Sequence, residues 1–347
     1  MLKTNTKKLQ KSEVEIEGEL AADAFENYFG RALKKIGETV KLDGFREGKI
    51  PESVLLGNIS EVRILEEMAN LALSEHYPKI LEEEKLDAIG HPEIQITKLA
   101  RKNPLGFKIK IATLPKIELP DYKDLAKKVL SQITEADKDT TVTDKELENT
   151  ILDIQKSRAP KKHVTEDMKE DEIKEELPPL DDEFVKALGP FKNVEDFKEK
   201  LKINIKLEKE NRNKEKTRVK IIEDIIEKTK VDLPEILVEI ELDKILYRME
   251  SDIAQMGLKF EDYLKHLNKT LEDLKKEFRS DAEKKAKLAL VLNEISKIEK
   301  IVADEKDVEK EVTLILEHYK EADPERARIH AENVLTNERI FQFLENQ

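Results

Sequence analysis

The sequence contains no cysteine and no tryptophan, and aromatic residues make up only 5% of its 347 positions. Without cysteine, disulfides, thiolate metal sites and a cysteine nucleophile are excluded, and the composition fits a reducing compartment. So few aromatic side chains provide little material for lining a deep small-molecule pocket. These absences point away from disulfide scaffolds and from proteins built around an enclosed ligand site.

Long hydrophobic runs are also absent. No stretch approaches the roughly 18 apolar residues of a membrane helix, and the N-terminal segment lacks the apolar core of a secretory signal. We therefore expect a cytoplasmic protein that has no membrane partner.

Charge, in contrast, is abundant. Asp, Glu, Lys and Arg make up 40% of the residues, and the formal net charge is -13. A typical soluble domain has about 25% charged residues, so each core should be thin. The negative total argues against a general nucleic-acid binder, but residues 1–115 carry 18 basic and 19 acidic side chains and are almost neutral. This N-terminal third could approach a polyanion that the rest of the chain would repel.

Motifs for catalysis and for metal binding do not occur in the sequence. The nearest match to a phosphate-binding loop, Gly44 to Lys49, is one residue too short and is followed by Ile50 where a hydroxyl would bind Mg²⁺. The six histidines form no metal-binding pattern, and the nucleophile-elbow and dinucleotide-binding motifs are missing. We predict no catalytic residue, no metal site and no cofactor, so an enzyme is the less expected class.

Periodicity predicts a small α+β domain over residues 1–115. Apolar residues alternate with glutamates from Val14 to Leu20, which is typical of a half-buried strand. The loop that contains Phe45 offers this ring no periodic partner, so we expect it to be exposed. The predicted order is β-α-loop-α-β-β, with elements at 14–20, 25–37, 41–51, 60–84, 94–96 and 107–111.

Beyond residue 115 the pattern changes to long charged helices. Thr143 and Glu146 form a capping box that opens one helix, and a second helix of about 38 residues should begin at Asn193. Pro234 is expected at the first position of the next helix, which should end before Gly257. We therefore predict an elongated all-α domain with projecting arms, whose last helices cover 260–278, 280–300, 304–320 and 324–345.

Residues 44–51 read Gly-Phe-Arg-Glu-Gly-Lys-Ile-Pro and resemble the G-F-R-x-G-K-x-P loop of the trigger factor family of ribosome-associated bacterial chaperones. Residues 88–94 resemble the tail domain of that family, and residues 176–184 and 290–299 resemble its chaperone domain. The resemblance implies four regions: a ribosome-binding tail domain at 1–115, a linker and first part of the helical domain at 116–158, a charged linker at 159–176, and a C-terminal chaperone domain at 177–347.

The resemblance also implies a missing part. Family members typically insert an FKBP-like peptidyl-prolyl isomerase domain of about 100 residues where this chain has only the charged segment 159–176. A segment so short and so polar cannot build a sheet around an aromatic pocket. We therefore expect no FKBP-like domain and no isomerase activity, and a residual isomerase is the less favoured alternative.

The resemblance assigns the ribosome contact to the loop. Family members dock on a ribosomal protein at the exit of the peptide tunnel, and many carry a second basic residue where this chain has Glu47. The carboxylate lowers the local positive charge, which predicts docking that is either looser or tuned to a different partner surface. The residues carried over from the family motif are Gly44, Phe45, Arg46, Gly48 and Lys49.

The helical region is expected to hold nascent and unfolded polypeptides in an open, apolar-lined cradle, without a nucleotide. Met249, Ile253 and Met256 are the candidate client contacts, since the two methionines lie seven apart on one helix face and methionine adapts to varied partners. Simple core packing of both methionines is the alternative. A homodimer of the free protein stays open, and so does a different function, a helical scaffold or assembly factor that docks through the N-terminal domain but holds no clients.

Overall fold

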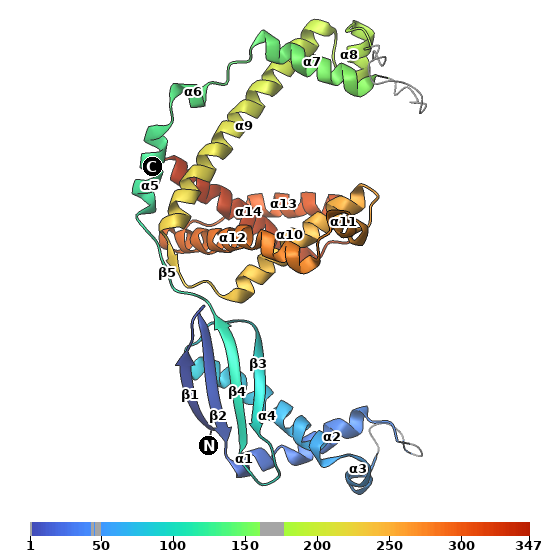
Figure 1. Ribbon diagram of the computed structural model, residues 1–347, viewed down its shortest axis with the longest axis vertical. Helices are drawn as coiled ribbons and strands as arrows, with labels where there is room; N and C mark the ends of the chain where they lie inside the picture. Colours follow the sequence, from blue (N-terminus) through green and yellow to red (C-terminus); the bar gives the residue numbers. More distant parts are fainter. Residues whose placement is uncertain (1, 43–44, 46–49, 160–176) are drawn as a thin grey trace. The chain divides into compact units, whose positions relative to one another are not determined.

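The computed structural model describes residues 2–42, 45, 50–159 and 177–347. These residues form two compact units, each built from two separate parts of the chain (Figure 1). The first unit comprises Met1–Leu119 and Lys228–Lys300, and the second comprises Pro120–Glu227 and Ile301–Gln347. The domain boundaries expected at residues 115, 158 and 176 follow chain order and stay a prediction.

The N-terminal part of the first unit contains an antiparallel sheet in the order β1-β2-β4-β3. Its strands are β1 (Leu2–Lys8), β2 (Glu13–Leu20), β3 (Ala88–Lys98) and β4 (Leu105–Thr113). Along β2, Val14 and Ile16 are buried while the glutamates between them point to the opposite face, as the alternation predicted. One face of the sheet therefore belongs to a core and the other carries charge.

Four helices accompany this sheet: α1 (Ala22–Glu26), α2 (Phe29–Thr39), α3 (Glu52–Asn58) and α4 (Glu61–Glu83). The Ser60 hydroxyl accepts a hydrogen bond from the backbone N–H of Arg63 and so caps the start of α4. Side chains from α1, α2 and α4 share one hydrophobic cluster with the buried face of the sheet, and Phe25, Met68 and Ile109 are fully buried there. The N-terminal part thus closes around a single core.

Two details of the N-terminal prediction are wrong. Strand β1 was not predicted, because Leu2 is its only large apolar residue and the strand is defined by its pairing with β2. The helix expected over 25–37 is two helices, since Tyr28 donates its N–H to the carbonyl of Phe25, a tighter turn than an α-helix allows. The second of these helices ends at Thr39, close to the predicted end near Gly37.

The C-terminal part of the first unit consists of α10 (Glu235–Gln255), α11 (Phe260–Leu267) and α12 (Leu271–Glu299). Pro234 lies at the N-cap of α10, one position before the predicted place, and Gly257 ends the turn after it with a φ of 78°. The break predicted near residue 279 is wrong: Ala282 and Ala286 are both buried, so the apolar stripe of α12 continues without interruption. Helices α10 and α12 pack through Val238, Leu242 and Ala282.

Two links join these parts of the first unit. Strand β5 (Ile117–Glu118) pairs with β6 (Lys230–Val231), although more than a hundred residues separate them in the sequence. At the turn between β1 and β2, the N–H of Ser12 donates to the Asp232 carboxylate at 2.8 Å. The neighbouring Lys11 forms an ion pair of 2.6 Å with Glu235, at the start of α10.

In its described residues, the second unit consists of helices and the segments that connect them, with no strand. Thr143 and Glu146 form the predicted capping box at the start of α7. Near its first turns, α9 shares a cluster with α7 and α8 through Ile151, Val185 and Phe197. The helices are α5 (Tyr122–Gln132), α6 (Glu135–Lys138), α7 (Asp144–Arg158), α8 (Asp182–Leu188), α9 (Val194–Lys228), α13 (Glu305–His318) and α14 (Pro324–Glu345).

A buried arginine fastens the later turns of α9 to α14. The two terminal nitrogens of Arg218 donate to the Glu338 carboxylate at 2.7 Å each, and its Nε donates to Glu345 at 2.7 Å. The guanidinium also lies 5.1 Å from the ring centre of Phe341. Hydrogen bonds from Arg218 lower the pKa of Glu338 to about 2.

The fold class expected from the sequence, an α+β N-terminal region followed by a helical remainder, is confirmed. Among the described residues, none of the helices combines the length and the apolar character needed to cross a bilayer.

Candidate functional site

The loop between α2 and α3 carries the predicted ribosome contacts. Phe45 is 42% exposed and stays outside the core of the N-terminal part, as expected, and its N–H donates to the carbonyl of Leu42 at 3.1 Å. The other predicted contacts lie outside the described residues, and so does Glu47: they are Gly44, Arg46, Gly48 and Lys49. At this loop the structure therefore shows an exposed aromatic ring.

A second candidate lies along α10, α11 and α12. A groove of about 600 Å³, here called the α10 groove, contains all three predicted client contacts. Ile253 is only 5% exposed and belongs to its floor, whereas Met256 is 73% exposed. So large an exposure does not fit core packing of Met256. The groove is lined by Glu241, Lys244, Ile245, Arg248, Met249, Asp252, Ile253, Met256, Leu258, Tyr263 and Lys285.

Helical geometry explains the apolar floor of the α10 groove. Ile245, Met249 and Ile253 follow one another at spacings of four along α10, and Met256, at the C-cap of this helix, extends the same stripe three positions further. Ile245 was not among the predicted contacts, although the same spacing from Met249 would have found it. Leu258 and Tyr263 were not predicted either, and they reach the groove only because the chain turns at Gly257. The periodicity of a single helix cannot predict contacts that residues make after a turn of the chain.

Charged side chains line the α10 groove beside this apolar stripe. Lys244 forms an ion pair of 2.7 Å with Glu241. The other three charged residues, Arg248, Asp252 and Lys285, have no ion pair within the part of the chain that the structure describes. The groove therefore combines an apolar floor with charges that remain available to a partner.

Other exposed apolar residues lie on the second unit. On α9, Ile203 and Leu207 are one turn apart and both more than half exposed, and Tyr319 beyond α13 is 70% exposed. Scattered exposed apolar residues are normal on protein surfaces. The two neighbours on α9, however, form the same kind of i, i+4 apolar pair as the α10 groove.

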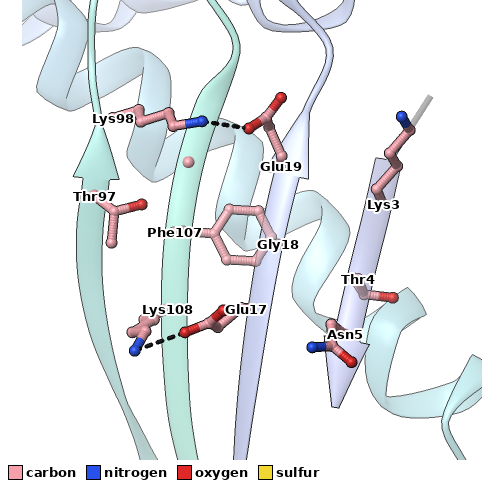
Figure 2. A pocket seen from close by; sticks show the side chains of 11 residues that line it. Lys3, Thr4, Asn5, Glu17, Gly18, Glu19, Thr97, Lys98, Phe107 and Lys108 are labelled. Carbon is pink, nitrogen blue, oxygen red and sulfur yellow. Dashed lines mark hydrogen bonds and ion pairs between the residues drawn. The ribbon is translucent and has the colours of Figure 1, made fainter.

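A hollow of about 460 Å³ on the N-terminal sheet has a different character (Figure 2). Its surroundings include Gly18 and Gly106, and four of its charged residues form two ion pairs. Lys98 contacts Glu19 at 2.8 Å and Lys108 contacts Glu17 at 2.7 Å. The hydrogen bond from Lys98 lowers the pKa of Glu19, and the bond to Glu17 raises the pKa of Lys108. With charged side chains around it, this hollow offers little to an apolar chain.

Among the residues described, no three His, Asp or Glu side chains gather closely enough to hold a metal ion. The structure brings the predicted client contacts together in one groove. Most of the predicted ribosome contacts lie outside the described residues.

Comparisons with known proteins cover almost the whole chain. Residues 2–154 match the family model described as bacterial trigger factor protein, and residues 193–340 match the model of its C-terminus. A trigger factor of Carboxydothermus hydrogenoformans is 26% identical over 404 aligned positions, covering 96% of this chain and 95% of the relative. One of Clostridium tetani is 24% identical, with 88% of each chain covered.

A solved structure is also similar, and it comes from work on "Promiscuous Substrate Recognition in Folding and Assembly Activities of the Trigger Factor Chaperone". The match has a TM-score of 0.53 and 17% identity, and it covers 99% of both chains. At this identity the similarity supports the fold.

Proposed function

The chain belongs to the trigger factor family and is a chaperone, and we propose that it docks at the exit of the ribosomal peptide tunnel and holds nascent or unfolded polypeptides without ATP. The exposed ring of Phe45 is the observation that carries this proposal. The α10 groove supports the holding of clients.

Docking uses the loop that contains Phe45. A solvent-exposed aromatic ring next to an arginine is the type of pair that dominates the binding energy of protein interfaces. Phe45 supplies the apolar contact on a ribosomal protein, while Arg46 and Lys49 supply positive charge, and Gly44 and Gly48 complete the motif. Glu47 reduces the local positive charge and so weakens electrostatic attraction to the ribosome.

Holding uses weak, exchangeable apolar contacts. Met249 and Met256 are flexible side chains, and Met256 projects into solvent beside the buried Ile253. A client side chain in the groove gains apolar burial with little reorganisation of the groove. Release needs no nucleotide, because a folding client buries the same side chains that the groove holds.

We further propose that this chaperone lacks isomerase activity. The two matched ranges leave only residues 155–192 between them, and the alignment with the Carboxydothermus hydrogenoformans relative is longer than this chain. Both observations support the loss of a domain from that position. A refolding assay limited by proline isomerisation measures the activity, and catalytic acceleration above a buffer control would overturn this part of the proposal.

The docking experiment is co-sedimentation with ribosomes, using the full chain with Phe45→Ala and Arg46→Ala together. We expect binding to fall to background. Val62→Ala with Arg63→Ala is the matched control, because Val62 is also exposed and is also followed by an arginine, on the surface of α4. Equal loss in both variants, or unchanged binding of the loop variant, would reject the assigned contact.

The alternative, a scaffold that holds no clients, is separated by an aggregation assay. The full chain at a few-fold excess should suppress aggregation of a chemically denatured protein upon dilution, with no nucleotide present, whereas a scaffold should not. The homodimer left open by the sequence stays a prediction that sedimentation equilibrium of the free protein measures.

A further inference from the structure

We propose that Met256 is an oxidation site, at which a peroxide converts the thioether to the sulfoxide and so weakens the binding of clients to the α10 groove. This inference rests on the proposed holding function and adds control by oxidation to it. Two features carry it, the exposure of the Met256 side chain and its place in the lining of an apolar groove.

Methionine is the only sulfur-containing residue type of this chain. The sequence has five methionines, no cysteine and no tryptophan. Since thiols are absent, a peroxide that reaches this protein finds thioethers as its sulfur targets. Met1 and Met168 lie outside the described residues, which leaves Met68, Met249 and Met256 for comparison.

These three methionines differ in exposure. Met68 is fully buried in the core of the N-terminal part, Met249 is half-buried, and Met256 is 73% exposed. The space beside Met256 is open, because a Cβ atom added at the next residue, Gly257, would meet no atom within 4 Å. Oxidation requires contact with the oxidant, so we expect Met256 to react first, Met249 second and Met68 last.

The reaction needs a peroxide as its only co-reactant. The sulfur of Met256 attacks one oxygen of hydrogen peroxide, the S–O bond forms as the O–O bond breaks, and the other oxygen leaves as water with both protons. The sulfur is oxidised by two electrons and the peroxide is reduced. Methionine sulfoxide reductases return the sulfoxide to the thioether, so the modification is reversible.

The sulfoxide changes the surface that a client contacts. Met256 extends the apolar stripe of Ile245, Met249 and Ile253, and oxidation replaces its flexible apolar end with a polar group. A client side chain that packs there must displace water from the sulfoxide oxygen, and the contact loses apolar burial. The net charge does not change, so the loss of affinity should be the same at low and high salt.

The test treats the full chain with hydrogen peroxide, removes the oxidant, and then measures sulfoxide and affinity separately. Mass spectrometry of proteolytic peptides follows the sulfoxide at each methionine over time. Anisotropy titrations use a labelled peptide built from Leu, Phe and Ser, which contains no sulfur. We expect the affinity to fall by about 3- to 10-fold as Met256 is converted, and to recover after treatment with methionine sulfoxide reductases A and B.

Met256→Leu is the decisive variant, because leucine has a similar volume and no sulfur. Its own untreated affinity is its reference, and peroxide should not lower that affinity. Met68→Leu is the matched control: it makes the same exchange in a core away from the groove and should keep the full sensitivity to peroxide. Thermal melts before and after treatment check that each protein remains folded.

Each result decides the inference. Oxidised protein that binds as tightly as untreated protein, or oxidation of Met68 as fast as that of Met256, would overturn the inference and leave the proposed holding function in place. A loss of affinity that persists in Met256→Leu would overturn the assignment to this residue. If the untreated protein does not bind the peptide, the holding function at this groove fails together with the inference.

Discussion

The sheet and the helices α10–α12 of the first unit differ in how many of their apolar side chains are buried and how many of their charges form ion pairs. Around the sheet, the large apolar residues of β2 and β4 are buried in one cluster, although Ile94 of β3 is 44% exposed. Charges of the outer face pair across strands, as Lys110 does with Glu13 at 2.9 Å. Along the α10 groove, Met256 is exposed and Arg248 has no ion pair among the residues described. Charged side chains such as Lys110 on the sheet thus have partners within the protein, whereas side chains of the groove can still contact a partner.

The largest effect on stability should come from adding a methyl group to the close packing on the sheet. A Cβ atom at Gly18 would lie 2.2 Å from Cζ of Phe107, whose ring covers this glycine (Figure 2). We expect Gly18→Ala to lower the free energy of unfolding by about 2–3 kcal/mol, since an overpacked core must shift its backbone. Urea denaturation followed by circular dichroism measures it.

Gly30→Ala is the matched control for this change. The site on α2 has no atom within 4 Å of the added methyl group, so alanine should stabilise the helix by about 0.5–1 kcal/mol. A Gly18→Ala variant as stable as the unchanged protein would show that the sheet is not tightly packed there.

A smaller effect should follow from removing the buried charge of the second unit. Arg218→Met leaves two carboxylates without their guanidinium and should cost about 2 kcal/mol, less than for a fully buried pair because the Glu338 side chain is 39% exposed. Arg31→Met, which breaks an exposed pair with Glu75, should cost under about 1 kcal/mol. Similar losses in both variants would contradict the distinction.

The same arginine predicts a pH dependence. The pKa of Glu338 is lowered to about 2 from an ordinary value of 4.5, so its stabilisation is fully present above about pH 4.5 and is lost as the pH falls toward 2. The difference in melting temperature between the unchanged protein and Arg218→Met should therefore be constant from about pH 7 to 5 and shrink below that. A difference that grows on acidification would contradict the assignment.

The smallest effect on stability should come from shortening a side chain that lines the α10 groove. The same change should weaken the binding of clients. Met256→Ser removes an exposed side chain, so the free energy of unfolding should change by less than about 0.5 kcal/mol. Affinity for an unfolded client should fall by about 3- to 10-fold, because the apolar contact is lost. Aggregation assays and anisotropy titrations measure both.

Tyr247→Ser provides the comparison for Met256→Ser. Tyr247 is 75% exposed on the same helix but does not line the groove, so its replacement should leave client affinity unchanged. Equal losses in the two variants would mean that clients bind α10 without using the groove.

Sequence patterns predicted the features that depend on neighbours along the chain. The capping box of Thr143 and Glu146, the exposure of Phe45, and the common face of Met249 and Met256 all follow from local spacing, and the structure contains them. The roles assigned to Phe45 and the methionines stay predictions.

Features that depend on distant partners were missed. Strand β1 is mostly polar, and its place in the sheet depends on pairing with β2. Arg218 resembles any other charge of a polar helix, and its ion pairs join residues 120 and 127 positions apart. Leu258 and Tyr263 reach the α10 groove from beyond a turn. Periodicity carries no information on which distant segments meet.

The pairing of β5 with β6 gives the first unit a simple topology. Ile117 pairs with Val231 and Glu118 with Lys230, so the chain departs from this unit and comes back to it through two adjacent strands. Everything between them is an excursion whose ends are tied at one place. Segments within such an excursion can change in length without stretching the paired strands, so the domain loss that we propose between residues 155 and 192 would leave the topology of the first unit unchanged.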